Sequence, residues 1–407
     1  MTPLALDVAA VRRRFPALTN SPADGVFLDG PGGTQVPESV ITAMGEAMAA
    51  SMSNIGGAFD RSVVSESIVT AAREAVADLM DAEPDGVVFG QNMTSHTVAF
   101  SRAMARRWVP GDEIVVTRLD HDANVTPWRL AAADRGVRVR TVDFDPADGT
   151  LDLDSFTSAL GPRTRLVAVT AASNALGTVP PMAQLIALAH GAGALVYVDA
   201  VHFSAHRLLS IRSLHADFVA ASAYKFFGPH TGVVVANPEH LAALDPYKVV
   251  PAPERGPGRW ETGTQSFEAL AGVTAAVDYL ASLGSGETRR RRLESAFDSI
   301  GAHESALAGR FLTAVAELPR VRVFGVTDPH RLDQRVGTFA VEVEGVAPRR
   351  VAARLGEQGL YVWDGDYYAV GVMERLGKAP DGLVRIGFVH YNTTAEVDRV
   401  VTALDAF

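Results

Sequence analysis

The chain alternates short β-branched runs with longer amphipathic segments between about residue 86 and residue 236. This alternation is typical of β-α-β units arranged around a mostly parallel sheet. Helical patterns fill the intervals, for example at 95–108 and at 182–192. The alternation therefore predicts an α/β fold with a mainly parallel sheet of seven strands, at 87–89, 114–116, 137–144, 166–170, 195–199, 218–221 and 233–236.

Polar residues directly follow several of these predicted strands. In an open parallel sheet, ligands bind beyond the carboxyl ends of the strands, so side chains at those ends lie near one another. We therefore expect one site at this edge of the sheet, built from residues 90–95, Asp120 with His121, Ser173 with Asn174, Asp199 with His202, and residues 222–225.

A change of pattern follows the last predicted strand. Residues 251–257 hold three prolines and two charges, which predicts a linker or a crossing loop. The 407 residues suffice for two domains, at roughly 150 residues each. Beyond the loop we expect a smaller α+β domain, helix-rich to about residue 318, with strands at 336–343 and 384–388 and helices at 348–358 and from 394.

The charge and hydropathy of the chain exclude several classes of partner. Asp and Glu number 47 against 37 Lys and Arg, and a net charge of −10 disfavours nucleic acid and anionic membranes. No apolar run approaches the about 20 residues of a membrane span, and Arg12 to Arg14 interrupt any signal-like segment. The basic run at 289–292 precedes a helical pattern and is typical of a solvated helix face. We therefore expect a cytoplasmic protein.

Cysteine is absent from the chain. Its absence rules out disulfides, thiolate metal ligands and a thiol of the chain as nucleophile. His202 and His206 have i, i+4 spacing, but the glutamate of a zinc metalloprotease helix is missing, so we expect no metal site.

Lys225 is the first candidate for chemistry, because it follows a predicted strand and precedes two phenylalanines. Burial of that kind lowers the pKa of a lysine and frees its amine to attack an aldehyde. Asp199 stands at the end of another predicted strand. A lysine Schiff base with a carboxylate partner for the pyridinium nitrogen is the minimal site for pyridoxal phosphate (PLP), so the pair predicts this cofactor.

The remaining parts of such a site are also present. His121 ends a predicted strand, and its imidazole can lie over a flat cofactor ring. Thr94 and Ser95 open a helix after a glycine-led turn, and hydroxyls with unpaired backbone N–H groups suit an anion such as phosphate. Ser222 adds a hydroxyl beside Lys225.

These residues occur in motifs that span almost the whole chain. The sequence resembles the class V aminotransferase superfamily of fold-type I PLP enzymes, and within it the cysteine desulfurase-like branch. The motifs that carry the resemblance are 27–34, 120–124 with Pro127 and Trp128, 173–178, 198–202, 222–229, 261–264 and 391–393.

The resemblance implies a role for each candidate residue. Lys225 forms the imine with the cofactor, Asp199 pairs with the pyridinium nitrogen and His121 stacks on the ring. Arg385 clamps the α-carboxylate of the substrate with its bidentate fork. The other implied contacts are to the phenolic oxygen of the cofactor, from Asn174 and His202, and to its phosphate, from Thr94, Ser95, Ser222 and, across a subunit boundary, Thr264.

The resemblance also implies an architecture. We expect a large PLP-binding domain over residues 21–262 and a small domain formed by residues 1–20 together with 263–407. Because Thr264 reaches the site of the neighbouring subunit in this family, the expected assembly is a homodimer with its active site at the subunit interface.

Three departures from the desulfurase pattern bear on activity. Tyr224 stands where desulfurases generally have histidine, so a phosphate contact there is altered or lost, and His202 stands where many members have glutamine. The loop at 364–368 falls where desulfurases carry the cysteine that takes sulfur as a persulfide. A persulfide relay is therefore excluded.

The chemistry that remains acts on an α-amino acid through an external aldimine that loses a proton to Lys225. Elimination of a β-substituent makes a lyase, including one that splits a C–S bond, and this is the reading that we favour. An aminotransferase or an epimerase is the alternative, and a non-catalytic PLP-binding scaffold is a third. Tyr367 and Tyr368 are candidates for the acid or the second proton donor, or are aromatic residues of the loop.

Overall fold

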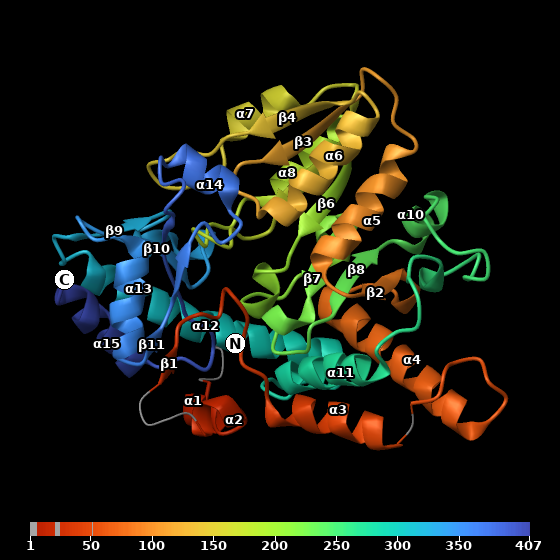
Figure 1. Cartoon of the computed structure of the whole chain (residues 1–407), viewed down its shortest axis with the longest axis horizontal. Coiled ribbons are helices and arrows are strands. Elements are labelled where there is room, and N and C mark those ends of the chain that lie inside the picture. Colours follow the sequence, from red (N-terminus) through yellow and green to blue (C-terminus); the bar gives the residue numbers. More distant parts are fainter. Residues whose placement is uncertain (1–5, 21–24, 51) are drawn as a thin grey trace.

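The computed structural model describes residues 6–20, 25–50 and 52–407 of the chain (Figure 1). Its largest sheet has seven strands in the order β2-β8-β7-β6-β5-β3-β4. All neighbouring pairs are parallel except those of β8, which runs antiparallel to β2 and β7. The predicted mainly parallel sheet is confirmed, with strands β2 (Val87–Gly90), β3 (Glu113–Thr117), β4 (Arg138–Val142), β5 (Thr164–Thr170), β6 (Leu195–Asp199), β7 (Phe218–Ser222) and β8 (Gly232–Ala236).

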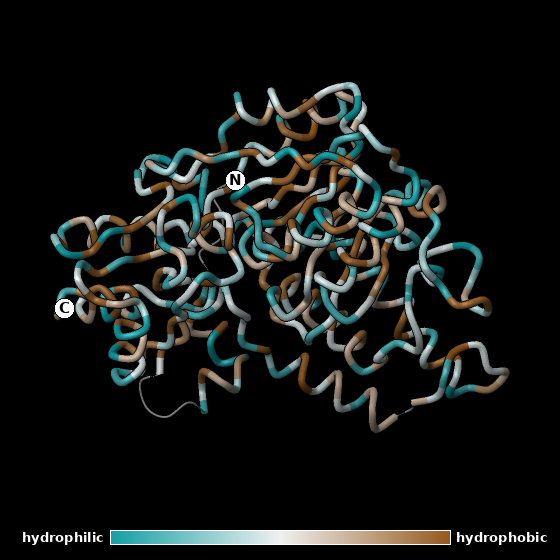
Figure 2. The backbone as a smooth tube through the Cα atoms, turned by 45° about the horizontal axis from the view of Figure 1, so that its top comes forward, coloured by the Kyte–Doolittle hydropathy of each residue, from teal (hydrophilic) through white to brown (hydrophobic). Residues whose placement is uncertain are grey.

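Helices cover both faces of this sheet (Figure 1). Successive side chains of a strand point to opposite faces, and in β5 Val167 and Val169 join one apolar cluster while Leu166 and Ala168 join the other. Figure 2 shows the hydrophobic colour concentrated along the central strands. The helices of this part are α4 (Asp60–Met80), α5 (Met93–Ala105), α6 (Thr126–Asp134), α7 (Leu153–Ala159), α8 (Met182–Gly191), α9 (Ile211–Leu214), α10 (Pro238–Ala243), α11 (Phe267–Ala281) and α3 (Glu38–Ala50), which packs on α11.

A second sheet of four antiparallel strands lies in the C-terminal part, in the order β12-β13-β10-β9. Its strands are β9 (Val321–Phe324), β10 (Thr338–Val343), β12 (Trp363–Gly365) and β13 (Leu383–Gly387). A third apolar cluster joins it to α12 (Arg289–Val315), α13 (Pro348–Glu357) and α15 (Thr394–Asp405). The α+β prediction for this part is confirmed, although β9 and β12 were not expected.

The N-terminal segment connects the two parts. After α1 (Val8–Arg12) and α2 (Pro16–Thr19), β1 (Val26–Phe27) pairs in parallel with β11 (Leu360–Tyr361). The helix α14 (Val370–Arg375) follows the loop after β12. The predicted domain boundaries at residues 262 and 263 stay a prediction, and the predicted start of the large domain at residue 21 lies outside the described residues.

Two expectations from charge and hydropathy can be compared with the fold. The basic run opens α12, where Arg289 pairs with Asp78 and Asp278 and where Arg290 and Arg291 pair with Glu294. Within the described part of the chain, no helix is long and apolar enough to cross a bilayer.

Candidate active site

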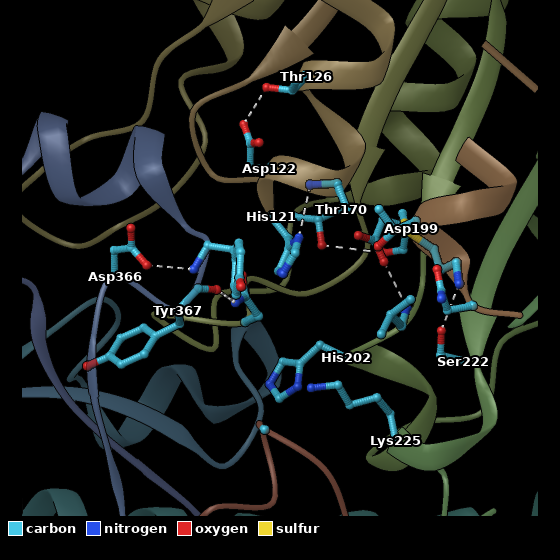
Figure 3. Close-up of a pocket in the computed structure, with 18 of the residues that line it drawn as sticks. His121, Asp122, Thr126, Thr170, Asp199, His202, Ser222, Lys225, Asp366 and Tyr367 are labelled. Atoms are coloured by element: carbon cyan, nitrogen blue, oxygen red, sulfur yellow. Dashed lines mark hydrogen bonds between the residues drawn. The ribbon is translucent and has the colours of Figure 1, made fainter. Parts of the chain in front are cut away.

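A cavity of about 800 Å³ lies between the carboxyl edge of the seven-stranded sheet and the loop that follows β12 (Figure 3). The sequence predicted thirteen site residues, and all of them except Ser95 and Thr264 line this cavity. They come from both sheets: Thr94, His121, Asn174, Asp199, His202, Ser222, Tyr224 and Lys225 from the larger one, and Tyr367, Tyr368 and Arg385 from the smaller one and its loop.

Lys225 ends a 3-10 turn (Ala223–Lys225) directly after β7. Its Nζ donates a hydrogen bond to the carbonyl of Pro31 and lies 5.1 Å from the centre of the Tyr224 ring. Burial lowers the pKa of Lys225 to about 7, with a further lowering by the charge of Arg385 and opposition from Asp199 and Asp29. About half of the amine is therefore unprotonated and nucleophilic at neutral pH.

The turn that carries Lys225 is tied to the N-terminal segment through Thr34. The Thr34 hydroxyl donates to the carbonyl of Tyr224 at 3.1 Å and accepts from the N–H of Phe227 at 2.9 Å. Phe227 has a φ of 70°, a conformation that bulky residues adopt only where the surroundings hold them. The glycine-rich stretch before Thr34 thus helps to set the lysine in place.

Asp199 is the last residue of β6 and is buried below the cavity floor. Its Oδ1 accepts a hydrogen bond from the N–H of Val201 at 2.9 Å. Burial raises the pKa of Asp199 to about 6, against that hydrogen bond and the charge of Lys225. At neutral pH the group is a carboxylate that lines the same cavity as the Lys225 amine, and the predicted roles of the two as Schiff-base lysine and acidic partner stay a prediction.

The amino end of α5 forms one end of the cavity. Asn92, Met93 and Thr94 line it, and the Ser222 hydroxyl accepts the N–H of Met93 at 3.1 Å. Gly232 lets the strand β8 approach closely, because a Cβ there would lie 2.3 Å from the carbonyl carbon of Asn92. A 13-residue helix that opens on a cavity with free hydroxyls suits an anion.

Ser95 and Thr264 lie outside the cavity lining. The Ser95 hydroxyl donates to Oδ1 of Asn92 at 2.7 Å, and the Ser95 N–H donates to the same oxygen, so Asn92 is the N-cap of the helix and Ser95 its partner. Thr264 is exposed in the loop before α11. Its expected contact across a subunit boundary stays a prediction.

Arg385 is buried in β13, with its guanidinium 4.5 Å from the centre of the Tyr367 ring. Its Nη1 donates to the carbonyl of Asn174 at 3.1 Å. Burial lowers the pKa of Arg385 to about 10, which leaves it cationic at neutral pH. Nε of Arg385 and Oδ1 of Asn174 are buried without a partner in the described residues, and such atoms indicate a ligand that supplies one.

His121 follows β3, and its Nδ1 accepts the N–H of Ala123 at 3.0 Å. Its proton is therefore on Nε2. Burial, with the charges of Lys225 and Arg385, lowers the pKa of His121 to about 4, so the ring is neutral and stacks with Tyr368 at 5.4 Å between centres. The hydroxyl of Tyr367, by contrast, donates to the carbonyl of Leu383.

His202 lies beside Lys225 in Figure 3. Its Nε2 is 2.8 Å from Oγ1 of Thr338, and its ring contacts that of His206, which is paired with Glu304 at 2.7 Å. Burial, with the charges of His206 and Lys225, lowers the pKa of His202 well below its usual value. The described residues contain no group of side chains that could hold a metal ion.

The sequence did not single out several residues of this site. The carboxylate of Asp29 influences both Lys225 and Arg385, and burial raises its pKa. The lining also includes residues without an assigned role, among them Thr170, Asp122, Trp363 and Asp366. In the sequence, only the glycines at 30, 32 and 33 indicated that the backbone near Asp29 lies close to another part of the chain.

The fold, with a lysine after a sheet strand and a carboxylate on the neighbouring strand, is that of fold-type I PLP-dependent transferases. The chain belongs to the aminotransferase class-V family, whose model matches residues 26–400. This confirms the resemblance on which the predicted roles depend.

Known relatives cover the whole length of the chain. It is 35% identical to the uncharacterized protein MT3887 of Mycobacterium tuberculosis, over 98% of this chain and 99% of that one. It is 30% identical to a cysteine desulfurase of Enterobacter sp. (strain 638), over 98% of each. An apo cysteine desulfurase of Thermococcus onnurineus NA1 superposes with a TM-score of 0.88 at 25% identity, over 100% and 99% of the two chains.

A more distant structure shares the fold. It is the C-DES mutant K223A with glycine covalently linked to its PLP cofactor, which superposes with a TM-score of 0.81 at 18% identity, over 97% and 99% of the two chains. At that identity the match shows the shared fold alone.

Proposed function

We propose that this protein is a PLP-dependent lyase that removes a β-substituent from an α-amino acid, including a sulfur substituent, without a persulfide relay. One observation carries the proposal: the Lys225 amine, the Asp199 carboxylate and the Arg385 guanidinium converge on one cavity in a chain that has no cysteine.

The cavity residues fit the cofactor. When bound, PLP supplies an aldehyde for an amine and a ring that accepts the negative charge of the substrate α-carbon. Asp199 would hold the ring nitrogen, His121 one ring face, and Thr94 with Ser222 and the α5 amino end the phosphate. Asn174 and His202 would contact the phenolic oxygen, and the unpartnered Oδ1 of Asn174 is suited to such a polar contact.

The remaining steps fall to side chains of this chain. Arg385 would hold the α-carboxylate of the substrate through its fork, with Nε free for one of the two bonds. Lys225, with a pKa of about 7, is suited to take the α-proton at neutral pH. The β-substituent then leaves with the electrons of its bond, and water completes the conversion to an oxo acid and ammonia.

The state of the loop tyrosines favours elimination over epimerisation. An epimerase needs an acid that returns a proton to the opposite face of the α-carbon. The Tyr367 hydroxyl donates to the Leu383 carbonyl and its ring supports Arg385, which leaves it unsuited to that task. Tyr368, 70% exposed and stacked on His121, is the remaining candidate for the acid that protonates a leaving group.

The test is a product analysis with S-substituted cysteines and the PLP-loaded protein. We expect pyruvate, ammonia and free thiol in equal amounts, and none of them from Lys225→Ala. Conversion of the cofactor to its amine form, with an oxo acid but no thiol, would show an aminotransferase instead. Loss of chirality without either product would show an epimerase, and an unchanged cofactor absorbance with every amino acid would show a scaffold.

We also propose that the protein is a homodimer. Several large apolar side chains of α3, α4 and the segment between them are at least half exposed, which is unusual for a monomer: Ile41, Met48, Ile55, Phe59 and Val63. A second copy would cover these side chains, and the family resemblance separately implies that Thr264 of one protomer reaches the cavity of the other.

A further inference from the structure

The outer wall of the cavity carries three carboxylates that the proposed chemistry does not use: Asp122, Asp364 and Asp366. Asp364 is paired with Arg349 at 3.2 Å. Within the described part of the chain, neither Asp122 nor Asp366 forms an ion pair. Asp122 accepts only the Thr126 hydroxyl at 2.8 Å, and Asp366 the N–H of Tyr368 at 2.9 Å.

The charges of the cavity are separated in space. Among its described lining residues, the only Lys or Arg side chains are Lys225 and Arg385, which the proposed function assigns to the α-proton and to the α-carboxylate of the substrate. In Figure 3 the carboxylates of Asp122 and Asp366 lie away from Lys225, with His121 between them in that view. A substrate whose α-carbon lies at Lys225 and whose α-carboxylate is held by Arg385 would therefore extend its side chain toward these carboxylates.

Unsatisfied polar atoms in the same cavity independently indicate a ligand. Nε of Arg385 and Oδ1 of Asn174 are buried without partners, and their residues are only 6% and 8% exposed. These atoms account for one end of the ligand. The carboxylates of Asp122 and Asp366, which have no ion-pair partner among the described residues, line the part of the cavity away from Lys225 (Figure 3).

Two aromatic faces accompany the carboxylates. Tyr368 is 70% exposed and Trp363 is 53% exposed, and both line the cavity. Aromatic faces attract cations through the quadrupole of the ring, and carboxylates attract them through charge. The combination disfavours an anionic side chain and gives a cationic one an attraction that a neutral side chain of the same shape lacks.

From this arrangement we propose that the substrate is an α-amino acid whose side chain ends in a cation, an ammonium or a guanidinium, bound by Asp122 and Asp366. The inference rests on the proposed function, because that function determines the direction in which the substrate lies in the cavity. It assigns Asp122 and Asp366 as specificity residues, with no part in the bond that breaks.

The test compares cationic amino acids with neutral ones of nearly equal shape, by titrating the PLP-loaded protein and following the cofactor absorbance. The pairs are L-arginine with L-citrulline, L-lysine with L-norleucine, and S-(2-aminoethyl)-L-cysteine with S-propyl-L-cysteine. We expect the cationic member to bind about tenfold tighter, the sum of two exposed ion pairs and a cation–π contact. Raising the ionic strength from about 0.01 M to about 1 M should reduce the preference.

Variants test whether the preference for a cationic side chain depends on Asp122 and Asp366. In Asp122→Asn with Asp366→Asn, which keep the acceptor oxygens for Thr126 and Tyr368, the preference should fall below about threefold, while affinity for L-alanine is unchanged. Asp134→Asn, the same substitution at an exposed position of α6 outside the cavity, should keep the full preference. Each single variant is measured as well, in case the pair does not fold.

The outcomes separate the inference from the proposed function. Equal affinity for both members of every pair, or a preference that the double variant retains, overturns the inference. Release of thiol and pyruvate without a charge preference overturns the inference and leaves the proposed lyase standing. A charge preference that depends on Asp122 and Asp366, without any elimination product, supports the inference and overturns the lyase.

Discussion

The amine of Lys225 is buried and is subject to the positive charge of Arg385, and both influences lower its pKa to about 7. A lysine attacks an aldehyde only when it is unprotonated. We predict that the rate of PLP incorporation into the protein rises about tenfold per pH unit below pH 7 and levels off above it. Borohydride trapping followed by peptide mass analysis measures this rate at Lys225.

A variant of Arg385 is the control for this measurement. Arg385→Gln removes a charge that opposes protonation of Lys225, so the inflection should move to higher pH in that variant. A wild-type inflection near the ordinary lysine pKa of about 10.4 would contradict the assignment. So would trapping of the cofactor at any other lysine.

At the scale of elements, the hydroxyl of Thr34 joins the N-terminal segment to the turn after β7. We predict that Thr34→Val lowers the free energy of unfolding by about 1–3 kcal/mol, because the buried N–H of Phe227 loses its acceptor. Urea denaturation measures the change, and PLP affinity should fall with it. Thr34→Ser, which keeps the hydroxyl, is the matched control, and equal stability of the valine and serine variants would refute the role.

Asp217 connects three elements, because its carboxylate meets His190 of α8 at 2.9 Å, His240 of α10 at 3.0 Å and the N–H of Val196 in β6 at 2.7 Å. Burial would raise the pKa of Asp217, but these hydrogen bonds outweigh it and lower the pKa. The hydrogen bond to Asp217 raises the pKa of His240, against burial.

These shifts predict a pH window for stability. Asp217 contributes to the free energy of unfolding above its unfolded pKa of about 4, and this contribution is lost as the pH falls through its lower native pKa. The His240 contribution is present below its unfolded pKa of about 6.5 and is lost as the pH rises through its higher native pKa. Asp217→Asn should therefore cost about 2 kcal/mol near pH 5 and less near pH 9, measured by urea denaturation. A cost that is the same at both pH values would argue against the ion pair.

At the scale of the whole molecule, the exposed apolar side chains of α3 and α4 predict an interface between two copies. We predict that the wild type sediments as a dimer and that Phe59→Asp with Val63→Asp converts it to a monomer, because burying two carboxylates in an apolar interface is costly. PLP retention should fall in the monomer. Val109→Asp places the same charge at a residue that is 56% exposed elsewhere and should leave the dimer intact, whereas a monomeric wild type would refute the interface.

Much of the fold could be predicted from the sequence because the signals are local. Apart from β4, the strands of the large sheet are mainly apolar runs of four to seven residues that are largely buried on both faces, and such runs stand out in any window. The strands β1, β11 and β12 have only two or three residues. They form because a neighbouring strand completes their hydrogen bonds, and the local sequence pattern does not indicate where that neighbouring strand is.

The site divides in the same way. That Lys225, Asp199 and Arg385 are candidates follows from residue type, strand ends and family motifs. That Asn92 caps α5 by accepting from Ser95, that Tyr367 supports Arg385, that Asp29 acts on Lys225, and that Asp122 and Asp366 line the cavity became visible only in three dimensions. Periodicity and motif are properties of neighbours along the chain, whereas a hydrogen bond, a lowered pKa and the charge of a cavity wall depend on groups that lie far apart in sequence and meet only when the two sheets pack together.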